Sequence, residues 1–268
     1  MVTTRPGGSP VGDLLREWRQ RRHRSQLDLA LDAEVSARHL SFVETGRSKP
    51  SRELVLHLAD HLDVPLRERN GLLLAAGYAP VYGQRAIDDD AMAPVREALD
   101  KVLAGHEPYP ALVVDRHWDI VAANGSALAL MGGLVAPELQ APPINALRVL
   151  LHPDGLAPHI TNLADYSAHV LHRLRHQATL AQDPALLDLY QELEAYPGVA
   201  ATSPAVHDLA ALVFTTLQLR VEGQDLALFS TLTTFGTALD VTLAELLIES
   251  FYPADEATSA VLRSLSTP

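Results

Sequence analysis

Five short helical segments follow one another in the first 80 residues, and short connections join them. The apolar residues of the first segment recur at i, i+3, i+4 and i+7: Val11, Leu14, Leu15 and Trp18. Ser25 and Ser36 stand at predicted helix starts, where a side-chain oxygen can cap free amides, and Gly46 and Gly77 stand at predicted helix ends. Connections this short leave no room for a sheet. Residues 10–80 are therefore predicted to form one all-α bundle.

The second and third segments of this bundle form the most specific pattern in the chain. Only Glu34 and Val35 separate the helix that begins at Gln26 from the helix that Ser36 caps. This spacing predicts a helix-turn-helix, whose second helix enters the major groove of DNA and reaches base edges with its N-terminal residues. The residues predicted to contact DNA are Gln26, Ser36, Ala37, Arg38, Ser41, Phe42, Arg47, Lys49 and Arg52.

Each of these side chains has an expected role. Arg38 is expected to form a bidentate pair with guanine, and Ala37 or Phe42 to touch a thymine methyl group. Gln26 is placed for a phosphate or base contact, while the basic residues after the third helix are expected to bind phosphates. Glu44 is expected to pair with a basic neighbour rather than to touch DNA. The alternative is a plain helical bundle whose arginines lie on a solvated face.

Charge is distributed unevenly along the chain. The net charge is −12, the wrong sign for a DNA-binding protein taken as a whole. Residues 1–80, however, carry 12 Lys and Arg against 10 Asp and Glu, whereas residues 81–268 carry 9 against 23. A mildly basic head on an acidic body is predicted, with the acidic part facing away from phosphate.

The pattern changes after residue 92. Two short apolar runs, 111–114 and 120–123, flank the turn DRHWD, and Asn124 can cap a helix through Met131. Strand, turn, strand, Asn and helix in this order open a PAS-type domain. The remaining predicted elements are a helical middle over about 144–195, strands over 211–221, 226–235 and 241–251 with a turn at Gly223-Gln224, and a closing helix over 253–265. Residues 92–268 are therefore predicted to form an α+β, PAS-like domain.

Several long stretches resemble one family of regulators. They include SQLDLALDAEVSARHLSFVETGRSKPS, DRHWDIVAANGSAL, LRVLLHPDGLAPHITN and LFSTLTTFGTALDVTLAELLIESFYPADEAT. With these stretches the chain resembles the MmyB-like group of the Xre/Cro-type helix-turn-helix regulators of actinobacteria, over nearly its whole length. The resemblance implies a lambda-repressor-like Xre DNA-binding domain followed by a PAS-like ligand-binding domain. It also implies a fatty acid as ligand class and control of antibiotic metabolism as role.

The sequence departs from the family pattern at two positions. Glu34 stands in the helix-turn-helix turn, where the family usually has Gly, so a left-handed backbone there would cost about 1 kcal/mol. Leu163 stands where relatives tend to have Trp, which is expected to alter the size of the ligand pocket.

An elongated apolar ligand with a polar head is the predicted occupant of the second domain. Apolar residues gather on its predicted strands, among them Val113, Ile120, Phe214, Leu228 and Phe229. A buried carboxylate head needs a cation or donors. The predicted ligand-binding residues are Arg148 as a carboxylate clamp, with His152 or Asn145 assisting, and Trp118. The alternative for Arg148 is a snorkelling or intramolecularly paired arginine, and the alternative for Trp118 is a packing role.

Two other functional classes compete with the regulator. One is a metal- or cofactor-binding enzyme or sensor, such as a haem or flavin PAS domain, with a helical interaction head. His169, His172 and His176 share one helix face, but Arg173 and Arg175 between them disfavour a further cation. The other is a protein-interaction adaptor without DNA affinity. The chain has no cysteine, no Gly-rich phosphate loop and no G-x-S-x-G motif.

The sequence prediction is therefore a regulator and not an enzyme, with no cofactor other than a bound fatty acid. Its expected partners are double-stranded DNA, a small apolar ligand and a second copy of the chain, because one recognition helix reads few bases. No signal pattern or long apolar stretch is present, so a cytoplasmic, nucleoid-associated protein without a membrane partner is expected.

Overall fold

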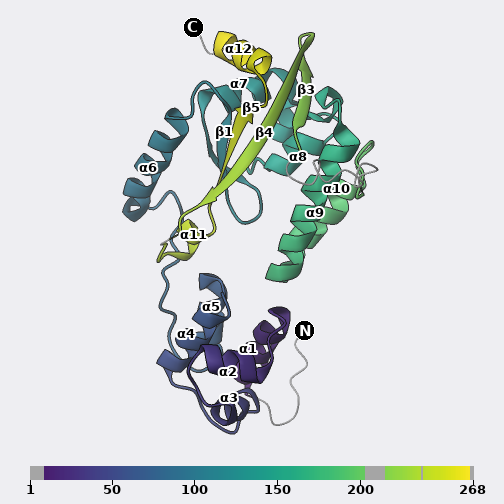
Figure 1. Ribbon diagram of the computed structural model, residues 1–268. Helices are drawn as coiled ribbons and strands as arrows, with labels where there is room; N and C mark the ends of the chain where they lie inside the picture. Colours follow the sequence, from purple (N-terminus) through teal and green to yellow (C-terminus); the bar gives the residue numbers. More distant parts are fainter. Residues whose placement is uncertain (1–8, 203–214, 237, 266–268) are drawn as a thin grey trace. The chain divides into compact units, whose positions relative to one another are not determined.

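Five helices with short connections make up the N-terminal part of the computed structural model, which describes residues 9–202, 215–236 and 238–265 (Figure 1). They are α1 (Pro10–Arg21), α2 (Gln26–Asp32), α3 (Ala37–Glu44), α4 (Arg52–His61) and α5 (Leu66–Ala75). The side chains of Ser25, Ser36 and Ser51 each accept a hydrogen bond from the backbone amide three residues further on. These caps satisfy amides that the first helical turn leaves free. The predicted all-α helix-turn-helix bundle is confirmed.

A leucine-rich core holds these helices together. Leu15, Leu29, Leu40 and Leu58 come from four different helices, and each is at most 1% exposed. Burying a leucine side chain stabilises a fold by about 1.5–3 kcal/mol. The periodic apolar residues seen in the sequence therefore account for the packing of the bundle.

The turn between α2 and α3 uses a left-handed residue, as the helix-turn-helix geometry requires. Glu34 has a φ of 51°. The amide of Val35 donates a hydrogen bond to the carbonyl of Ala30 at 2.9 Å and closes the end of α2. The turn thus forms with Glu34 in place of the glycine that is usual there, at a cost of about 1 kcal/mol.

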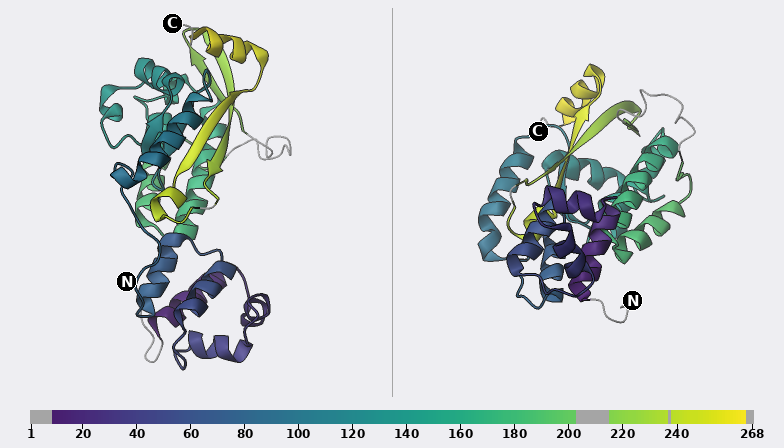
Figure 2. Two further views of the ribbon diagram at one scale, coloured as in Figure 1. Left: turned by 90° about the vertical axis from the view of Figure 1, so that its left-hand side faces the viewer. Right: turned by 60° about the horizontal axis from the view of Figure 1, so that its bottom comes forward.

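The C-terminal part of the chain is built on a five-stranded antiparallel sheet with the strand order β2-β1-β5-β4-β3. The strands are β1 (Ala111–Val114), β2 (Ile120–Ala123), β3 (Leu217–Val221), β4 (Gln224–Thr234) and β5 (Leu247–Pro253). The helices are α6 (Ala93–Ala104), α7 (Gly125–Leu134), α8 (Ala146–Leu151), α9 (Leu163–Ala181), α10 (Pro184–Glu194), α11 (Val241–Ala244) and α12 (Glu256–Leu265), with short 3₁₀ turns η1 (Asp90–Met92), η2 (Pro137–Gln140) and η3 (Ala157–His159). Helices α9 and α10 pack on each other, and α12 packs on β4 (Figure 2). This is the predicted α+β, PAS-like arrangement.

Asn124 joins the first strands of this domain to α7. As predicted, its side chain caps α7, since Oδ1 accepts a hydrogen bond from the amide of Ala127 at 3.0 Å. The same oxygen accepts from the amide of Ala111 at 3.0 Å, and Nδ2 donates to the carbonyl of Tyr109 at 2.8 Å. One buried side chain therefore fixes the start of β1 and the start of α7 together.

The β3–β4 hairpin forms with its turn one residue earlier than predicted. Glu222 and Gly223 occupy the turn with φ values of 50° and 79°, and Val221 pairs with Gln224. Two consecutive residues with positive φ are typical of a type I′ turn, whose twist matches that of the strands. Of the strand predicted over 211–221, residues 211–214 lie outside the described residues.

The prediction of one continuous strand over 241–251 is wrong. Asp240 Oδ1 accepts a hydrogen bond from the amide of Thr242 at 2.9 Å and caps the short helix α11. The strand β5 begins only at Leu247. Local hydrogen bonding by an aspartate competes with strand pairing, which explains why apolar residues alone misled the prediction.

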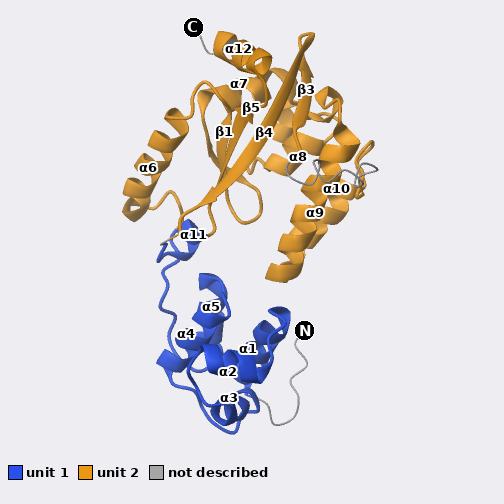
Figure 3. Ribbon diagram, in the orientation of Figure 1, with its two compact units in different colours: residues 1–85, 237–244 blue, residues 86–236, 245–268 orange. Residues whose placement is uncertain are grey.

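The chain divides into two compact units (Figure 3). Unit 1 comprises residues 1–85 and 237–244, and unit 2 comprises residues 86–236 and 245–268. The sequence predicts domains at 10–80 and 92–268, with 237–244 in the second domain. The structure instead assigns the segment that contains α11, between β4 and β5, to the helical unit.

Candidate functional site

Helix α3 presents an exposed face that is made of the residues predicted to contact bases. Leu40 and Val43, at most 1% exposed, hold the opposite face of the helix in the core. The predicted base contacts are exposed or half-buried: Ser36, Ala37, Arg38, Ser41 and Phe42. The exposed residues after α3 include the three predicted phosphate contacts: Arg47, Lys49 and Arg52. The structure thus brings a recognition helix and a basic segment together in one short stretch.

Aromatic rings orient several of these cations. The guanidinium carbon of Arg38 lies 5.3 Å from the centroid of the Phe42 ring, and that of Arg47 lies 5.9 Å from it. Lys49 Nζ lies 5.2 Å from the centroid of the Tyr78 ring. A ring face attracts a cation at such distances. Phe42 therefore helps to position two arginines, a role that the sequence analysis missed, and its contact with a thymine methyl group stays a prediction.

Glu44 ties the end of α3 to the two preceding helices. It is fully buried, and Arg19 of α1 donates from Nε to its Oε1 at 2.7 Å and from Nη2 to its Oε2 at 2.9 Å. Gln26 Nε2 of α2 donates to Oε2 at 2.7 Å, and Arg16 Nη2 donates to the Glu44 carbonyl at 2.9 Å. The predicted pairing of Glu44 with a basic neighbour is confirmed. The amide of Gln26 is engaged within the protein, so its predicted contact with DNA stays a prediction.

Electrostatics keep this buried pair ionised. Burial disfavours the carboxylate of Glu44, but the hydrogen bonds from Arg19 and Gln26 outweigh burial and hold the pKa of Glu44 below its usual value. The hydrogen bond to Glu44 in turn raises the pKa of Arg19 against the effect of its own burial. Both groups are therefore charged at neutral pH, and a buried ion pair holds the recognition helix.

Gly12 allows α1 to approach the end of α3 closely. A Cβ atom at this position would lie 2.4 Å from the carbonyl oxygen of Val43 and 2.9 Å from that of Glu44. Glycine inside a helix costs roughly 0.5–1 kcal/mol relative to alanine, and this close approach accounts for its presence. The sequence contained a signal for this contact, because a glycine inside a strongly periodic helix often indicates a packing reason. The sequence prediction did not use it.

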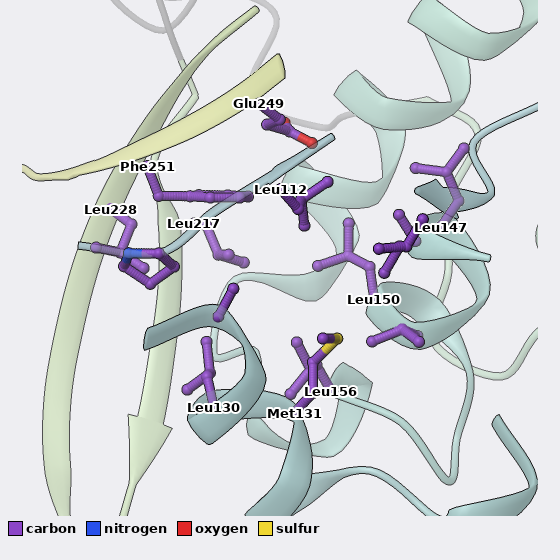
Figure 4. A pocket seen from close by; sticks show the side chains of 15 residues that line it. Leu112, Leu130, Met131, Leu147, Leu150, Leu156, Leu217, Leu228, Glu249 and Phe251 are labelled. Carbon is purple, nitrogen blue, oxygen red and sulfur yellow. The ribbon is translucent and has the colours of Figure 1, made fainter. Parts of the chain in front are cut away.

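A pocket opens in unit 2 between the sheet and helices α7 and α8 (Figure 4). The empty space in and around it, counted together with adjoining open solvent, amounts to about 600 Å³. Leu112, Leu217 and Leu228 line it from the sheet, while Met131 of α7 and Leu147 of α8 line it from the helices. The wall is almost entirely apolar, which is typical of a site for a small apolar ligand.

Glu249 of β5 is the one polar side chain among the described residues that line this pocket. It is 6% exposed, and Ser230 Oγ on the neighbouring strand donates to its Oε1 at 2.9 Å. Arg173 Nη2 of α9 lies 3.8 Å from the same oxygen. Burial raises the pKa of Glu249, and the charge of Arg173 and the hydrogen bond from Ser230 only partly oppose this effect.

The four residues predicted to bind the ligand lie outside the lining of this pocket: Arg148, Asn145, His152 and Trp118. Arg148 donates from Nε and Nη2 to Glu192 at 2.8 and 2.7 Å, a bidentate pair. The hydrogen bond to Glu192 raises the pKa of Arg148. Its guanidinium is therefore paired with a carboxylate of the same unit, as the alternative supposed, and the role of Arg148 as a carboxylate clamp stays a prediction.

The other three residues support the local structure beside the pocket. Asn145 caps α8 and donates from Nδ2 to Asp119 Oδ1 at 2.9 Å. The ring of His152 packs edge-on against Tyr196, with 4.9 Å between centroids. Trp118 is 1% exposed and donates from Nε1 to a side-chain oxygen of α9. Each is placed by protein contacts, as the packing alternative for Trp118 supposed.

Two of the five apolar residues predicted to surround a ligand, Ile120 and Leu228, do line the pocket, whereas Val113 and Phe229 do not. Phe214 lies outside the described residues. Leu163, expected to alter the pocket, is also not in its lining. Ala146 and Leu147 also line the pocket; they belong to the same apolar stretch as the predicted Arg148 but were not predicted as lining residues.

No group of three or more His, Cys, Asp or Glu side chains is arranged to hold a metal ion within the described ranges. His169, His172 and His176 lie on α9, and burial and the charge of Arg173 lower the pKa of His169. Among the described helices, none combines the length and apolar character needed to cross a membrane.

Two family models match the chain. The model described as the MmyB-like transcription regulator ligand binding domain matches residues 95–265, and a model described as a helix-turn-helix domain matches residues 10–72. Both matches confirm the resemblance seen in the sequence, and together they span the two parts of the fold. A comparison with curated proteins found no match.

Two solved structures are distantly similar to the chain. The PAS domain of BvgS from Bordetella pertussis is 15% identical, with 64% of this chain and 94% of that chain covered and a TM-score of 0.28. An RNA-binding light-oxygen-voltage receptor is 11% identical, with 96% of this chain and 64% of that chain covered and a TM-score of 0.25.

Proposed function

Since the chain belongs to the family of MmyB-like transcription regulators, we propose that it binds double-stranded DNA through α3 and that a small apolar ligand in unit 2 modulates this binding. The observation that carries the DNA-binding part is the exposed face of α3, which a buried ion pair and a leucine core hold in place. A helix fixed in this way can present its side chains to base edges without first being ordered.

Substitutions of Arg38 and Lys49 distinguish contacts with bases from contacts with the DNA backbone. We expect Arg38→Ala to relax base preference and to cost about 1–3 kcal/mol of specific binding. We expect Lys49→Ala to weaken binding to all sequences and to lower the salt slope by about one. The measurement is selection of duplexes from random sequences by the full chain, followed by Kd values over a range of salt concentrations.

Lys101→Ala on α6, in unit 2, is the matched control and should leave both readouts unchanged. An Arg38→Ala protein that selects the same sites as the wild type would show that α3 does not read bases. If the wild type shows no salt-dependent affinity for DNA, the alternative of a protein-interaction adaptor is favoured instead.

The regulator acts, in this proposal, as a homodimer. One recognition helix of eight residues reads few bases, and a two-fold pair doubles the contact. Palindromic sites in the selected duplexes would support this arrangement, because operator symmetry mirrors that of the protein. We further propose a cytoplasmic, nucleoid-associated location and no catalysis, since both matched family models describe regulatory domains.

The proposed ligand is a small molecule with a predominantly apolar body. The apolar wall of the pocket supports this class, and the sequence resemblance makes fatty acids the first candidates to test. Each Å² of apolar surface that ligand binding removes from water would stabilise the complex by about 25 cal/mol.

The β4–β5 connection supports a route from the ligand to the DNA-binding unit. Strands β4 and β5 both line the pocket, yet the chain between them belongs to unit 1. Within unit 1, Val241 N donates to the Gly83 carbonyl at 2.7 Å, and Thr242 Oγ1 donates to the Arg85 carbonyl at 2.6 Å. Arg85 also pairs with Asp240 at 3.5 Å. A ligand that shifts β4 against β5 would therefore act on a segment that is hydrogen-bonded within the helical unit.

A further inference from the structure

The one polar side chain among the described residues that line the pocket, that of Glu249, is already engaged by the protein. Ser230 Oγ donates to Glu249 Oε1 at 2.9 Å, and Arg173 Nη2 lies 3.8 Å from the same oxygen. Burial raises the pKa of Glu249, and the charge of Arg173 opposes this effect. The carboxyl is therefore a paired group, and it offers no free negative charge to a bound molecule.

Arg173, the partner of Glu249, is held outside the pocket. Its guanidinium carbon lies 4.6 Å from the centroid of the Trp118 ring, whose face attracts a cation. Its Nε is buried without a hydrogen-bond partner among the described residues, but no atom of Arg173 belongs to the lining. The positive charge of Arg173 is thus directed to Glu249 and to the ring, and not into the apolar space.

A charged end group of either sign would enter this pocket without a partner. All nine Lys and Arg residues of 81–268 lie within the described ranges, and none of them lines the pocket. The only acid in the described lining is already compensated by Arg173. Moving an unpaired carboxylate or ammonium from water into apolar surroundings costs far more than moving a neutral hydroxyl group.

On the basis of the proposed ligand-binding function, we infer that the pocket selects an uncharged apolar molecule, such as a long-chain alcohol or ester, over a fatty acid anion or an amine. The pairing of Glu249 with Arg173 sets this preference, because it leaves the polar end of the pocket without net charge. The ligand class therefore changes from fatty acids to neutral lipids.

Four molecules separate these classes: dodecanol, methyl dodecanoate, dodecanoate and dodecylamine, each used below its solubility limit and its micelle-forming concentration. Kd values for the full chain at neutral pH, from calorimetry or from the shift of the thermal midpoint, give the ranking. We expect the two neutral molecules to bind about tenfold or more tightly than either ion, a difference of about 1.4 kcal/mol.

Variants of the pair test why the neutral molecules are preferred. Glu249→Gln keeps the shape but leaves the charge of Arg173 without its partner, so dodecanoate should gain about tenfold in affinity relative to dodecanol. Glu249→Gln combined with Arg173→Gln removes both charges, so the ranking of the wild type should return. Glu138→Gln, at an exposed position in η2, is the matched control and should leave the ranking unchanged. The ranking of the wild type stands as a test even where a variant does not fold.

Two outcomes overturn the inference and leave the proposed function intact. One is that dodecanoate or dodecylamine binds to the wild type as tightly as dodecanol does, and the other is that a folded Glu249→Gln protein keeps the ranking of the wild type. If none of the four molecules binds to the wild type, the proposed ligand-binding function itself fails, and the inference fails with it.

Discussion

Replacing Glu44 with alanine should destabilise the DNA-binding unit by about 3–5 kcal/mol, because it leaves the buried guanidinium of Arg19 without its carboxylate. The same change removes the partner of Gln26 and frees the end of α3. We therefore expect the unfolding transition of unit 1 to move to much lower denaturant concentration, and specific DNA binding to fall with it. The measurement is denaturant unfolding of the full chain, followed by binding to a selected duplex.

Glu17→Ala is the control for this change. Glu17 pairs with Arg21 at 3.3 Å on the surface, and exposed pairs of this kind contribute about 0–1 kcal/mol. Equal losses of stability for Glu17→Ala and Glu44→Ala would contradict the structural role of the buried pair.

The pKa of Glu44 gives this interaction a defined pH dependence. Because the folded pKa lies below the unfolded value, the carboxylate contributes its stability fully above the unfolded pKa. The contribution is lost as the pH falls through the folded pKa. Unit 1 should thus be destabilised by acid below about pH 4, and Glu44→Gln should remove that part of the dependence.

Asn124→Ala should have the second large effect, this time on unit 2. It removes a helix cap, which costs about 1 kcal/mol, and it leaves buried backbone groups of Ala111 and Tyr109 unpaired, at about 1–3 kcal/mol each. Helix α7, which Asn124 caps, supplies Ala127 and Met131 to the pocket. Ligand binding should therefore weaken together with the stability of unit 2, as thermal unfolding with and without dodecanol would measure.

Two variants calibrate this expectation. Asn124→Asp keeps an acceptor for both amides but loses the donor to Tyr109, so an intermediate loss is expected. Asn162→Ala removes a half-buried bridge, from Nδ2 to the Thr216 carbonyl at 2.8 Å and from the Gln218 amide to Oδ1 at 3.1 Å. A loss for Asn124→Ala no greater than that for Asn162→Ala would show that Asn124 does not join β1 to α7 as described.

Local signals in the sequence were sufficient for the helical unit. Helical periodicity and serine caps act within a few residues, so they predicted the bundle and the exposed face of α3. Even the departure at Glu34 was readable, because a left-handed residue in a short turn is a local requirement. What was missed in this unit depends on distant partners, such as the approach of Gly12 to the carbonyl of Val43.

The ligand site was less accessible to sequence reasoning. An arginine in an apolar stretch favoured Arg148 as a clamp, but its partner Glu192 is 44 residues away and no spacing rule links them. Glu249 was missed because a lone acid in a strand normally indicates a solvated face. Its burial follows from the pairing of β5 between β1 and β4, which only the folded sheet reveals. The PAS-like order of strands and helices was nevertheless predictable from short patterns.

The assignment of residues 237–244 to the helical unit could not be derived from the pattern of apolar residues. It depends on hydrogen bonds from Val241 and Thr242 to backbone carbonyls about 160 residues earlier in the chain. The central claim is that a ligand modulates DNA binding. If these hydrogen bonds carry that coupling, removing one of them should weaken it. Thr242→Val removes one hydroxyl hydrogen bond with little change of shape, and Thr231→Val, at an exposed position in β4, is its matched control.

The most direct test of that claim is the Kd of the full chain for a selected duplex, measured with and without a saturating amount of dodecanol or dodecanoate, whichever stabilises the protein more. Coupling between two sites typically amounts to about 1–3 kcal/mol, so we expect the Kd to change about fivefold or more in either direction. Thr242→Val should reduce this change and Thr231→Val should not. An unchanged Kd for wild-type protein shown to be saturated with the ligand would contradict the account.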